Sequence, residues 1–301
     1  MVNYRGGLGN NLFDIAAAIV YAEKCNRRLV FEHYPTLPNL DKFSLSRIGM
    51  TYETFSENMK DISDEDIDNG VILPYNKNIK LTVFFQQYKR FDHIKDHVFD
   101  IMGLSAIRSS VIAKIKGLEF RERRGLFEKS GSVTISLHIR RGDYEELKCY
   151  FILLNEYYYK NAILKIVEKI NPGTSIKILC FYEKNSTVSC TQIVDKLKGD
   201  PDLNQYPLEY YHFNRILDEQ DANVSDIEEI AIMSHCDHHI IANSTYSWWG
   251  AYLNPDPNKM VSYPNEYFNH QLYYLSNDGL KVDGWMSVDS WNPWEWRCDC
   301  R

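Results

Sequence analysis

Hydrophobic positions in the second half of the chain form short runs that alternate with stretches of helical spacing. The runs SVTISLHI, SIKILCFY, LEYYHF, HHIIA and, as the last one, KMVSYP have the length and composition of buried strands. Between them, apolar residues recur at helical spacing, as from Tyr159 to Ile170, where Asn171-Pro172-Gly173 ends the helix. Ser225 to Glu228 has the spacing of a capping box. Strands separated by helices predict a parallel, doubly wound sheet with right-handed crossovers.

The first half opens in the same way and then becomes less regular. MVNYR reads as a strand, GGLGNN (Gly6 to Asn11) as a glycine turn, and the residues from Leu12 as a helix. Arg27 to Glu32 reads as a second strand, so the segment predicts a βαβ opening. Further on, Val83 to Phe91 is strand-like, and Ile94 to Phe120 predicts a helix.

A polar connector separates the two halves. RERR and KSGS lie between residues 121 and 132, and we place a domain boundary near residue 128. A chain of 301 residues can form two cores, so we predict an N-terminal domain over 1–128 and a C-terminal domain over 129–301. Two Rossmann-like halves would place a ligand between them, at the carboxyl ends of the strands.

Charge and composition exclude several classes of partner. The chain has 34 Lys and Arg against 41 Asp and Glu, a formal net charge of −7, which argues against nucleic-acid binding. No signal peptide precedes the glycine turn and no apolar run approaches membrane-spanning length. We therefore expect a cytoplasmic protein with at most peripheral membrane association. Its seven cysteines are scattered along the chain, which favours reduced thiols.

The glycine turn GGLGNN has two explanations. Glycines before a helix suit an anion, because free backbone N–H groups and the helix dipole would face it. A tight turn that needs positive φ explains them equally well. The segment is not a Walker A loop, and it lacks the third glycine of G-x-G-x-x-G. A nicotinamide oxidoreductase, with Glu32 as the ribose-binding acid, is therefore a weak alternative.

The motif HIRRGDY (His138 to Tyr144) follows a predicted buried strand. Strand alternation points His138 and Arg140 to the same side. Arg140 can then aim a bidentate fork at a diphosphate while Arg141 pairs with Asp143 or another acid. The alternative is a structural salt bridge at a strand end. The position at the carboxyl edge of a sheet favours the functional interpretation.

A hydroxyl-rich segment, NSTYS, follows the strand HHIIA. Ser244 and Thr245 are good helix-start residues, and their hydroxyls with the free N–H groups would hold a phosphate. Trp248 and Trp249 are expected in the core. The His and Cys residues over 235–239 suggest a metal, but strand alternation divides them between two faces, so we predict none. An arginine, a glycine turn and this helix start suit the leaving diphosphate of a nucleotide-sugar transferase.

Several segments resemble the α-1,2-fucosyltransferases of glycosyltransferase family 11. GGLGNNLFDIAAA, HIRRGDY, IMSHCDHHIIANSTYSWWGAYLN, VSYPNEYF and DGWMSVD follow the family's order over almost the whole chain. The resemblance implies an α/β fold of GT-B type, with two facing Rossmann-like domains and mainly parallel sheets. The N-terminal domain would take the acceptor and the C-terminal domain GDP-fucose. The implied reaction is metal-independent, inverting transfer of L-fucose from GDP-β-L-fucose to the 2-hydroxyl of a terminal β-galactoside, without a cofactor.

The resemblance also assigns residues to the donor. Arg140 would grip the β-phosphate and offset the charge of the leaving group, with His138 near the nucleoside. Asp237 would contact guanine. Ser244 and Thr245 would contact the phosphates.

Other assignments concern the first domain and the base. Gly9 and Asn10 would close over the donor. GNN stands where the family usually has GNQ, and Asp14 replaces a common Gln, so Asn11 and Asp14 leave the acceptor open. Asp143 is the candidate general base, although pairing with an arginine is its other possible role. The alternatives are a fucosyltransferase for another acceptor or linkage and a non-catalytic carbohydrate-binding protein.

Overall fold

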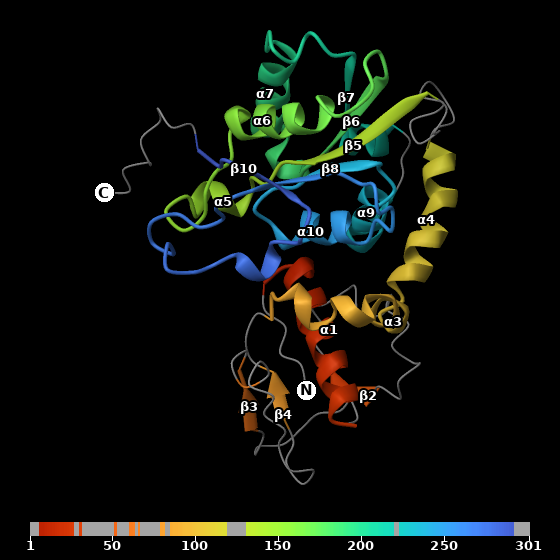
Figure 1. The fold of residues 1–301 in the computed structure, drawn as a ribbon, viewed down its shortest axis with the longest axis vertical. Coiled ribbons are helices and arrows are strands. Elements are labelled where there is room, and N and C mark those ends of the chain that lie inside the picture. The colour runs from red at the N-terminus through yellow and green to blue at the C-terminus, as the bar shows by residue number, and fades with distance from the viewer. Residues whose placement is uncertain are drawn as a thin grey trace. The chain divides into compact units, whose positions relative to one another are not determined.

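The chain forms two compact units in a computed structural model (Figure 1). The first comprises Met1–Ser110 and Asp278–Leu280, and the second Val111–Asn277 and Lys281–Arg301. The boundary predicted near residue 128 lies outside the described residues, and the contacts already assign the chain from Val111 to the second unit. The structure describes residues 6–26, 30–31, 51–52, 60–63, 66, 79–81, 85–118, 131–219 and 223–291.

Helix α1 (Leu8–Lys24) is the most buried element described in the first unit. Its Phe13 ring lies 5.9 Å from the ring of Phe91. The helix starts four residues before the predicted Leu12, because Gly7 is extended and already serves as the N-cap. Gly9 and Asn10 therefore lie in the first helical turn. The observed turn ends before Leu8 and is shorter than the predicted turn GGLGNN.

Two other predictions for this unit are wrong. The described part of the strand-like segment from Val83 to Phe91 contains a 3-10 helix, η3 (Tyr88–Arg90). The long helix predicted from Ile94 is divided in two, because Gly103 adopts a φ of +72° between the two parts. These are α3 (Lys95–Ile101) and α4 (Leu104–Leu118).

Short parallel strands complete the description of the first unit. Strand β1 pairs with β2, and β3 pairs with β4. The predicted opening strand MVNYR lies outside the described residues, and β1 is the described part of the predicted second strand. The remaining elements are β1 (Val30–Phe31), β2 (Thr51–Tyr52), β3 (Lys60–Ile62), β4 (Ile79–Leu81), η4 (Asp92–Ile94) and η6 (Asp278–Leu280).

The second unit is built on a six-stranded sheet, which is parallel throughout and ordered β10-β9-β8-β5-β6-β7. This confirms the α/β class with mainly parallel sheets. KMVSYP is not the last strand, because β10 follows it. The strands are β5 (Ser132–His138), β6 (Ser175–Phe181), β7 (Leu208–His212), β8 (His238–Ile240), β9 (Val261–Pro264) and β10 (Met286–Val288).

Helices cover both faces of this sheet. In Figure 1, α6 and α7 lie on one face, and α9 and α10 on the other. Trp248 and Trp249 of α10 are fully buried, as predicted for core residues. The capping box is confirmed, because Glu228 Oε2 accepts a hydrogen bond of 2.9 Å from the Ser225 N–H. The helices are α5 (Asp143–Glu146), α6 (Glu156–Val167), η5 (Lys184–Ser186), α7 (Thr187–Lys198), α8 (Phe213–Glu219), α9 (Asp226–Met233) and α10 (Thr245–Tyr252).

The winding of the sheet reverses direction once. From β5 the chain proceeds outward through β6 to β7, and it then returns to the other side of β5 to form β8, β9 and β10. The carboxyl ends of β5 and β8 are therefore neighbours at a topological switch point. Open α/β sheets bind ligands at such points.

The cysteines differ from the expectation of reduced thiols at one position. Cys25, Cys180, Cys190 and Cys236 are buried and form no disulfide. Cys149 is disulfide-bonded, so the expectation is wrong for this residue. Among the described residues, no helix has the length and apolar character needed to cross a membrane.

Candidate functional site

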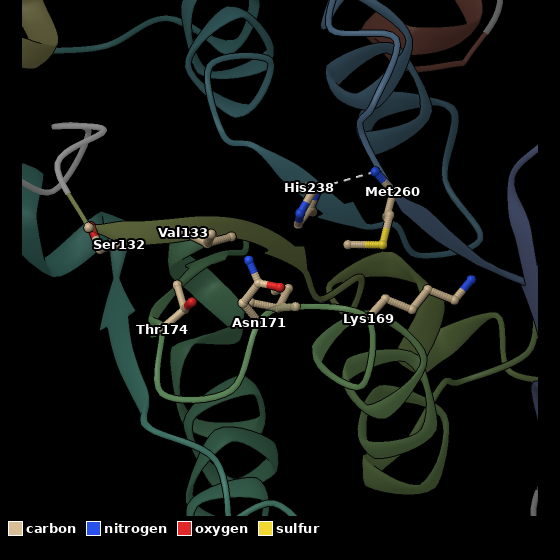
Figure 2. A pocket seen from close by; sticks show the side chains of 9 residues that line it. Ser132, Val133, Lys169, Asn171, Thr174, His238 and Met260 are labelled. Carbon is tan, nitrogen blue, oxygen red and sulfur yellow. Dashed lines mark hydrogen bonds between the residues drawn. The ribbon is translucent and has the colours of Figure 1, made fainter.

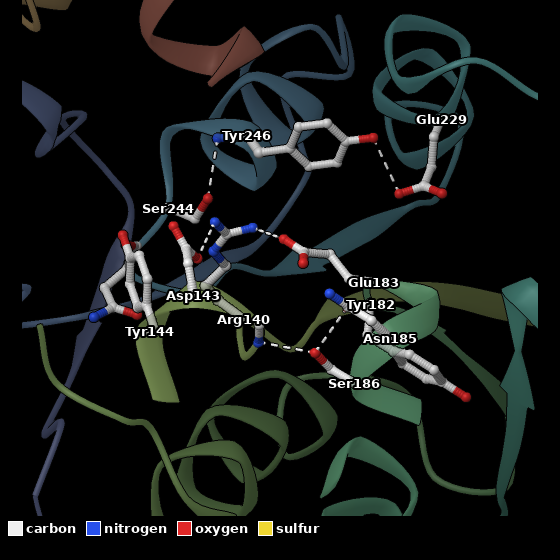
Figure 3. A network of polar contacts seen from close by, with 12 residues as sticks. Arg140, Asp143, Tyr144, Tyr182, Glu183, Asn185, Ser186, Glu229, Ser244 and Tyr246 are labelled. Atoms are coloured by element: carbon white, nitrogen blue, oxygen red, sulfur yellow. Dashed lines mark hydrogen bonds and ion pairs between the residues drawn. The ribbon is translucent and has the colours of Figure 1, made fainter. Parts of the chain in front are cut away.

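Five of the predicted site residues lie at the switch point of the second unit, and Figure 3 labels Arg140, Asp143 and Ser244 among them. His138 ends β5, and Arg140 and Asp143 follow it directly. Ser244 is the N-cap of α10 and its hydroxyl accepts from the Tyr246 N–H at 3.3 Å, while Thr245 is the first residue of that helix. The structure thus brings together the two motifs that the sequence predicts for a diphosphate.

Arg140 is held by two carboxylates. Its Nη2 donates to Asp143 Oδ1 at 2.5 Å, and its Nη1 donates to Glu183 Oε1. Asp143 therefore pairs with Arg140. Arg141, which is predicted to pair with Asp143 or another acid, donates to the Leu154 carbonyl at 2.9 Å. The side chains of Asp143 and Glu183 are 57% and 40% exposed, so water can solvate either carboxylate when it releases the guanidinium.

Glu183 is a site residue that sequence reasoning missed. It follows β6, whose Phe181 is the partner of His138 in the β5–β6 ladder. Two residues beyond this pair, Arg140 and Glu183 meet at the same sheet edge. An acid just after the neighbouring strand was the signal that could have identified Glu183.

Tyr144 connects the two strand ends at the switch point. Its ring lies 5.0 Å from the guanidinium carbon of Arg140, a cation–π contact. Its hydroxyl donates to the Asn243 carbonyl at 3.1 Å, which ties the segment after β5 to the segment after β8. Burial raises the pKa of Tyr144 to about 12, so it donates as a neutral phenol.

Gly142 allows the chain to pass closely beside Glu183. Its φ is +59°, and a Cβ added there would lie 2.3 Å from Glu183 Oε2. Its N–H donates to Ser186 Oγ at 2.8 Å. The turn after Arg140 therefore requires glycine for its backbone conformation and for space.

We expect Gly142→Ala to reduce both stability and transfer, because the new methyl group forces Glu183 away from Arg140. Gly173→Ala is the matched control, since Gly173 has a φ of +82° and nothing within 4 Å of an added Cβ. Gly173→Ala reports the cost of a side chain at positive φ, about 1–2 kcal/mol in the left-handed helical region. Gly142 has a ψ of −123° and lies outside that region, so Gly142→Ala loses stability through backbone strain as well as through the collision. The loss of transfer rate, which Gly173→Ala should not share, then measures the displacement of Glu183, and a wild-type transfer rate in Gly142→Ala would contradict it.

His138 is buried and neutral. Burial, with the charge of Arg140, lowers its pKa to about 3. No hydrogen-bond partner of its Nδ1 is found in the part of the chain that the structure describes. Its ring lies 5.7 Å from the ring of Tyr246. The Nδ1 atom is itself buried, so the contact of His138 with a nucleoside stays a prediction.

Glu229, in the first turn of α9, is a second acid that sequence reasoning missed. Its Oε1 accepts from the Tyr246 hydroxyl at 3.1 Å (Figure 3). Burial raises the pKa of Glu229 to about 7; Asp226 and Glu183 add to the increase, and the Tyr246 hydrogen bond opposes it. Among the described residues no cation lies within ion-pair distance of Glu229. The sequence analysis did not find it because the neighbouring Glu228 accounted for the capping box.

Asp237 does not lie with the other predicted donor residues. Its Oδ2 accepts from the N–H and the hydroxyl of Thr134, both at 2.8 Å. Thr134 lies near the start of β5, six positions before Arg140, which corresponds to roughly 20 Å along a strand. The Asp237 carboxylate is therefore bound at the amino edge of the sheet, at the end opposite to the switch point.

Gly9 and Asn10 belong to the first unit. Gly9 is buried in α1, and Asn10 Oδ1 accepts from Gln86 Nε2 at 2.9 Å. Their contact with the donor stays a prediction. Within the described residues, no group of three or more His, Cys, Asp or Glu side chains is arranged to hold a metal ion.

A pocket of about 410 Å³ lies at the amino edge of the same sheet (Figure 2). Its lining comes from the start of β5, the turn after α6, and the side chains of His238 and Met260. Open parallel sheets bind ligands at the carboxyl edge, so the switch point and not this pocket is the candidate site.

The chain is similar to characterised glycosyltransferases. Residues 50–288 match the model of Glycosyl transferase family 11. The O-antigen biosynthesis glycosyltransferase WbnK of Escherichia coli is 27% identical over 324 residues, covering 94% of this chain and 98% of the relative. An alpha-1,2-colitosyltransferase of Escherichia coli is 25% identical over 271 residues, covering 82% of this chain and 85% of the relative.

The chain also has a weak similarity to a solved structure. The fucosyltransferase NodZ from Bradyrhizobium has a TM-score of 0.48 and 15% sequence identity, covering 84% of this chain and 91% of that chain. Two α/β units with parallel sheets agree with the GT-B type predicted from the sequence. The family model spans most of the chain, including both motifs at the switch point. The chain therefore belongs to glycosyltransferase family 11 and is a glycosyltransferase.

Proposed function

We propose that this enzyme transfers L-fucose from GDP-β-L-fucose to the 2-hydroxyl of a terminal β-galactoside, with inversion and without a metal. The single observation that carries the proposal is the position of Arg140 beside the N-terminus of α10 at the switch point. In the reaction, the acceptor oxygen bonds to the anomeric carbon as the bond from that carbon to the β-phosphate oxygen breaks. GDP leaves with the electron pair, and the acceptor proton passes to a base or to water.

The charge that develops on the β-phosphate is offset from two sides. Arg140 supplies a planar fork of N–H donors. Ser244 and Thr245 supply hydroxyls and the N–H groups at the start of α10, where the helix dipole is positive. A diphosphate that reaches the fork displaces at least one of its carboxylates. The side chains of Asp143 and Glu183 are exposed, so a displaced carboxylate is solvated by water and no unpaired charge is buried.

Guanine recognition is assigned to Glu229 in this proposal, in place of Asp237. Guanine presents two N–H donors on one edge, and a carboxylate accepts both. Glu229 lies at the same sheet edge as Arg140, joined to the Tyr246 phenol, which packs beside the neutral His138 ring. Asp237 is bonded to Thr134 at the other edge and has no such position.

Asp143 is proposed to orient Arg140. The sequence predicts Asp143 as a catalytic residue besides Arg140. Among the described residues, Asp143 is the carboxylate nearest in sequence to Arg140. Its ion pair with Arg140 favours an orienting role over that of general base. An anomeric centre with oxocarbenium character needs little deprotonation of the acceptor before attack.

The proposed function is tested by GDP release from GDP-fucose in EDTA, with and without lactose or N-acetyllactosamine. We expect the acceptor to stimulate release, because transfer needs a hydroxyl nucleophile, and the chelator to leave the rate unchanged. Nuclear magnetic resonance of the product then identifies the linkage. Loss of release in EDTA with recovery on addition of Mn²⁺ would contradict the metal-free mechanism. GDP binding without stimulated release would point to another acceptor.

The name of one relative points to a second candidate donor substrate. The alpha-1,2-colitosyltransferase transfers colitose, a sugar that differs from fucose in lacking one hydroxyl, on C3. We expect GDP-fucose to be preferred. A higher kcat/KM with the 3-deoxy donor in the same assay would assign the enzyme to colitose transfer while leaving the phosphate site unchanged.

A further inference from the structure

Exposed apolar side chains are concentrated on two loops of the second unit. Tyr273 and Tyr274 are 75% and 69% exposed, and Tyr150 is exposed as well. We call these three residues the aromatic patch. The other exposed large hydrophobic side chains among the described residues are Leu275, next to the patch, and Ile112 and Val188.

The two loops that carry the aromatic patch are bonded to each other. Phe151 and Phe268 form an antiparallel bridge. The Asn269 N–H donates to the Tyr150 carbonyl at 2.7 Å, and the Gln271 N–H donates to the Cys149 carbonyl at 3.2 Å. The patch is therefore presented on a hydrogen-bonded ribbon.

The same ribbon continues into the proposed donor site. Phe151 stacks on Tyr144 with a centroid separation of 4.4 Å and an interplanar angle of 11°. Tyr144 also contacts the Arg140 guanidinium. A single row of contacts thus joins the leaving-group arginine to the loops that carry the exposed tyrosines.

We propose that the aromatic patch is a platform for the acceptor glycan, binding the sugars that precede the galactose to be modified. This inference rests on the proposed function, and it assigns part of acceptor binding to the second unit, whereas the sequence analysis expected the acceptor in the N-terminal domain. Tyrosine offers an apolar face and a polar tip, which match the C–H face and the hydroxyl rim of a pyranose. The segment QLYYLSN (Gln271 to Asn277) has no charged side chain and adds neutral amide and hydroxyl groups. It therefore suits a neutral oligosaccharide better than an anionic membrane or a charged peptide.

The proposal is tested with the double variant Tyr273→Ala/Tyr274→Ala and two acceptors, methyl β-galactoside and a trisaccharide that ends in β-galactose. The monosaccharide ends before the patch, so its KM stays unchanged, as do kcat and the KM for GDP-fucose. The KM for the trisaccharide rises about tenfold, equal to about 1.4 kcal/mol. Tyr273→Phe/Tyr274→Phe keeps the stacking faces and restores a near-normal KM. Val188→Ala, an exposed position on α7, changes neither acceptor.

Several results would overturn the platform. Equal KM changes for the two acceptors would show that the patch does not bind the additional sugars of the longer glycan. A wild-type dimer that becomes a monomer in the variant during size exclusion would assign the patch to a second copy. If the wild-type enzyme modifies neither acceptor, the proposed function fails separately. Binding of the trisaccharide to wild type and variant is then measured by saturation-transfer nuclear magnetic resonance. Weaker binding to the variant supports the platform, and equal binding overturns it.

Discussion

Arg140→Ala is expected to lower the rate of fucose transfer by about 10²–10³-fold, because it removes a preorganised donor from the charge that develops in the transition state. Arg140→Lys keeps the positive charge but loses the planar fork, so we expect its rate to lie between those of wild type and Arg140→Ala. The measurement is kcat for acceptor-dependent GDP release at saturating donor. If the Arg140→Ala enzyme retains the wild-type rate, the donor does not bind at the switch point.

The fold of Arg140→Ala should be preserved. The partners of the arginine are partly exposed, and pairs of this kind contribute at most about 1 kcal/mol to stability. Lys196→Ala is a matched control, because it breaks another exposed ion pair, with Glu156, away from the switch point. We expect the two variants to melt at similar temperatures and only Arg140→Ala to lose transfer. A large decrease in melting temperature for Arg140→Ala would assign the arginine a structural role.

The sheet and its switch point could be predicted because they depend on local patterns. The buried runs around Ile135, Ile178 and Ile240 are long enough to read as strands, and helices with clear apolar faces separate them. The position of Arg140 directly after the run SVTISLHI then placed it at the carboxyl edge. Helix limits depend on single backbone angles, and for this reason Gly7 and Gly103 moved the ends of α1 and α4 from their predicted positions.

The partners of the site residues could not be predicted, because they depend on ladder register. Asp237 and Ser244 flank the same strand, β8, and one lies at each edge of the sheet. The sequence analysis placed both at the donor. Glu183 meets Arg140 only because His138 is paired with Phe181. Nothing in the segment YEKNS identifies that neighbour without the strand order.

Glu229→Gln is expected to weaken GDP binding about 10–100-fold, because hydrogen bonds to a charged acceptor contribute about 1.5–3 kcal/mol and the amide replaces one acceptor oxygen by a donor. Isothermal titration with GDP and ADP measures the effect. We expect the variant to lose the preference for GDP over ADP. Glu228→Gln is the control, since this neighbour caps α9 and pairs with Lys114 instead of facing Tyr246.

The pH dependence of GDP binding distinguishes recognition of guanine by Glu229 from a structural role. The pKa of Glu229 is raised to about 7, so the carboxylate that accepts both guanine N–H groups is lost as the pH falls through 7. The dissociation constant for GDP should therefore rise below pH 7 more steeply in wild type than in Glu229→Gln, in which only the protonation of the GDP phosphate, with a pKa of about 6, remains. Burial disfavours the charged form, so the substitution should not lower the melting temperature at pH 8. A pH-independent affinity in wild type, or unchanged nucleotide preference in the variant, would assign guanine to another group.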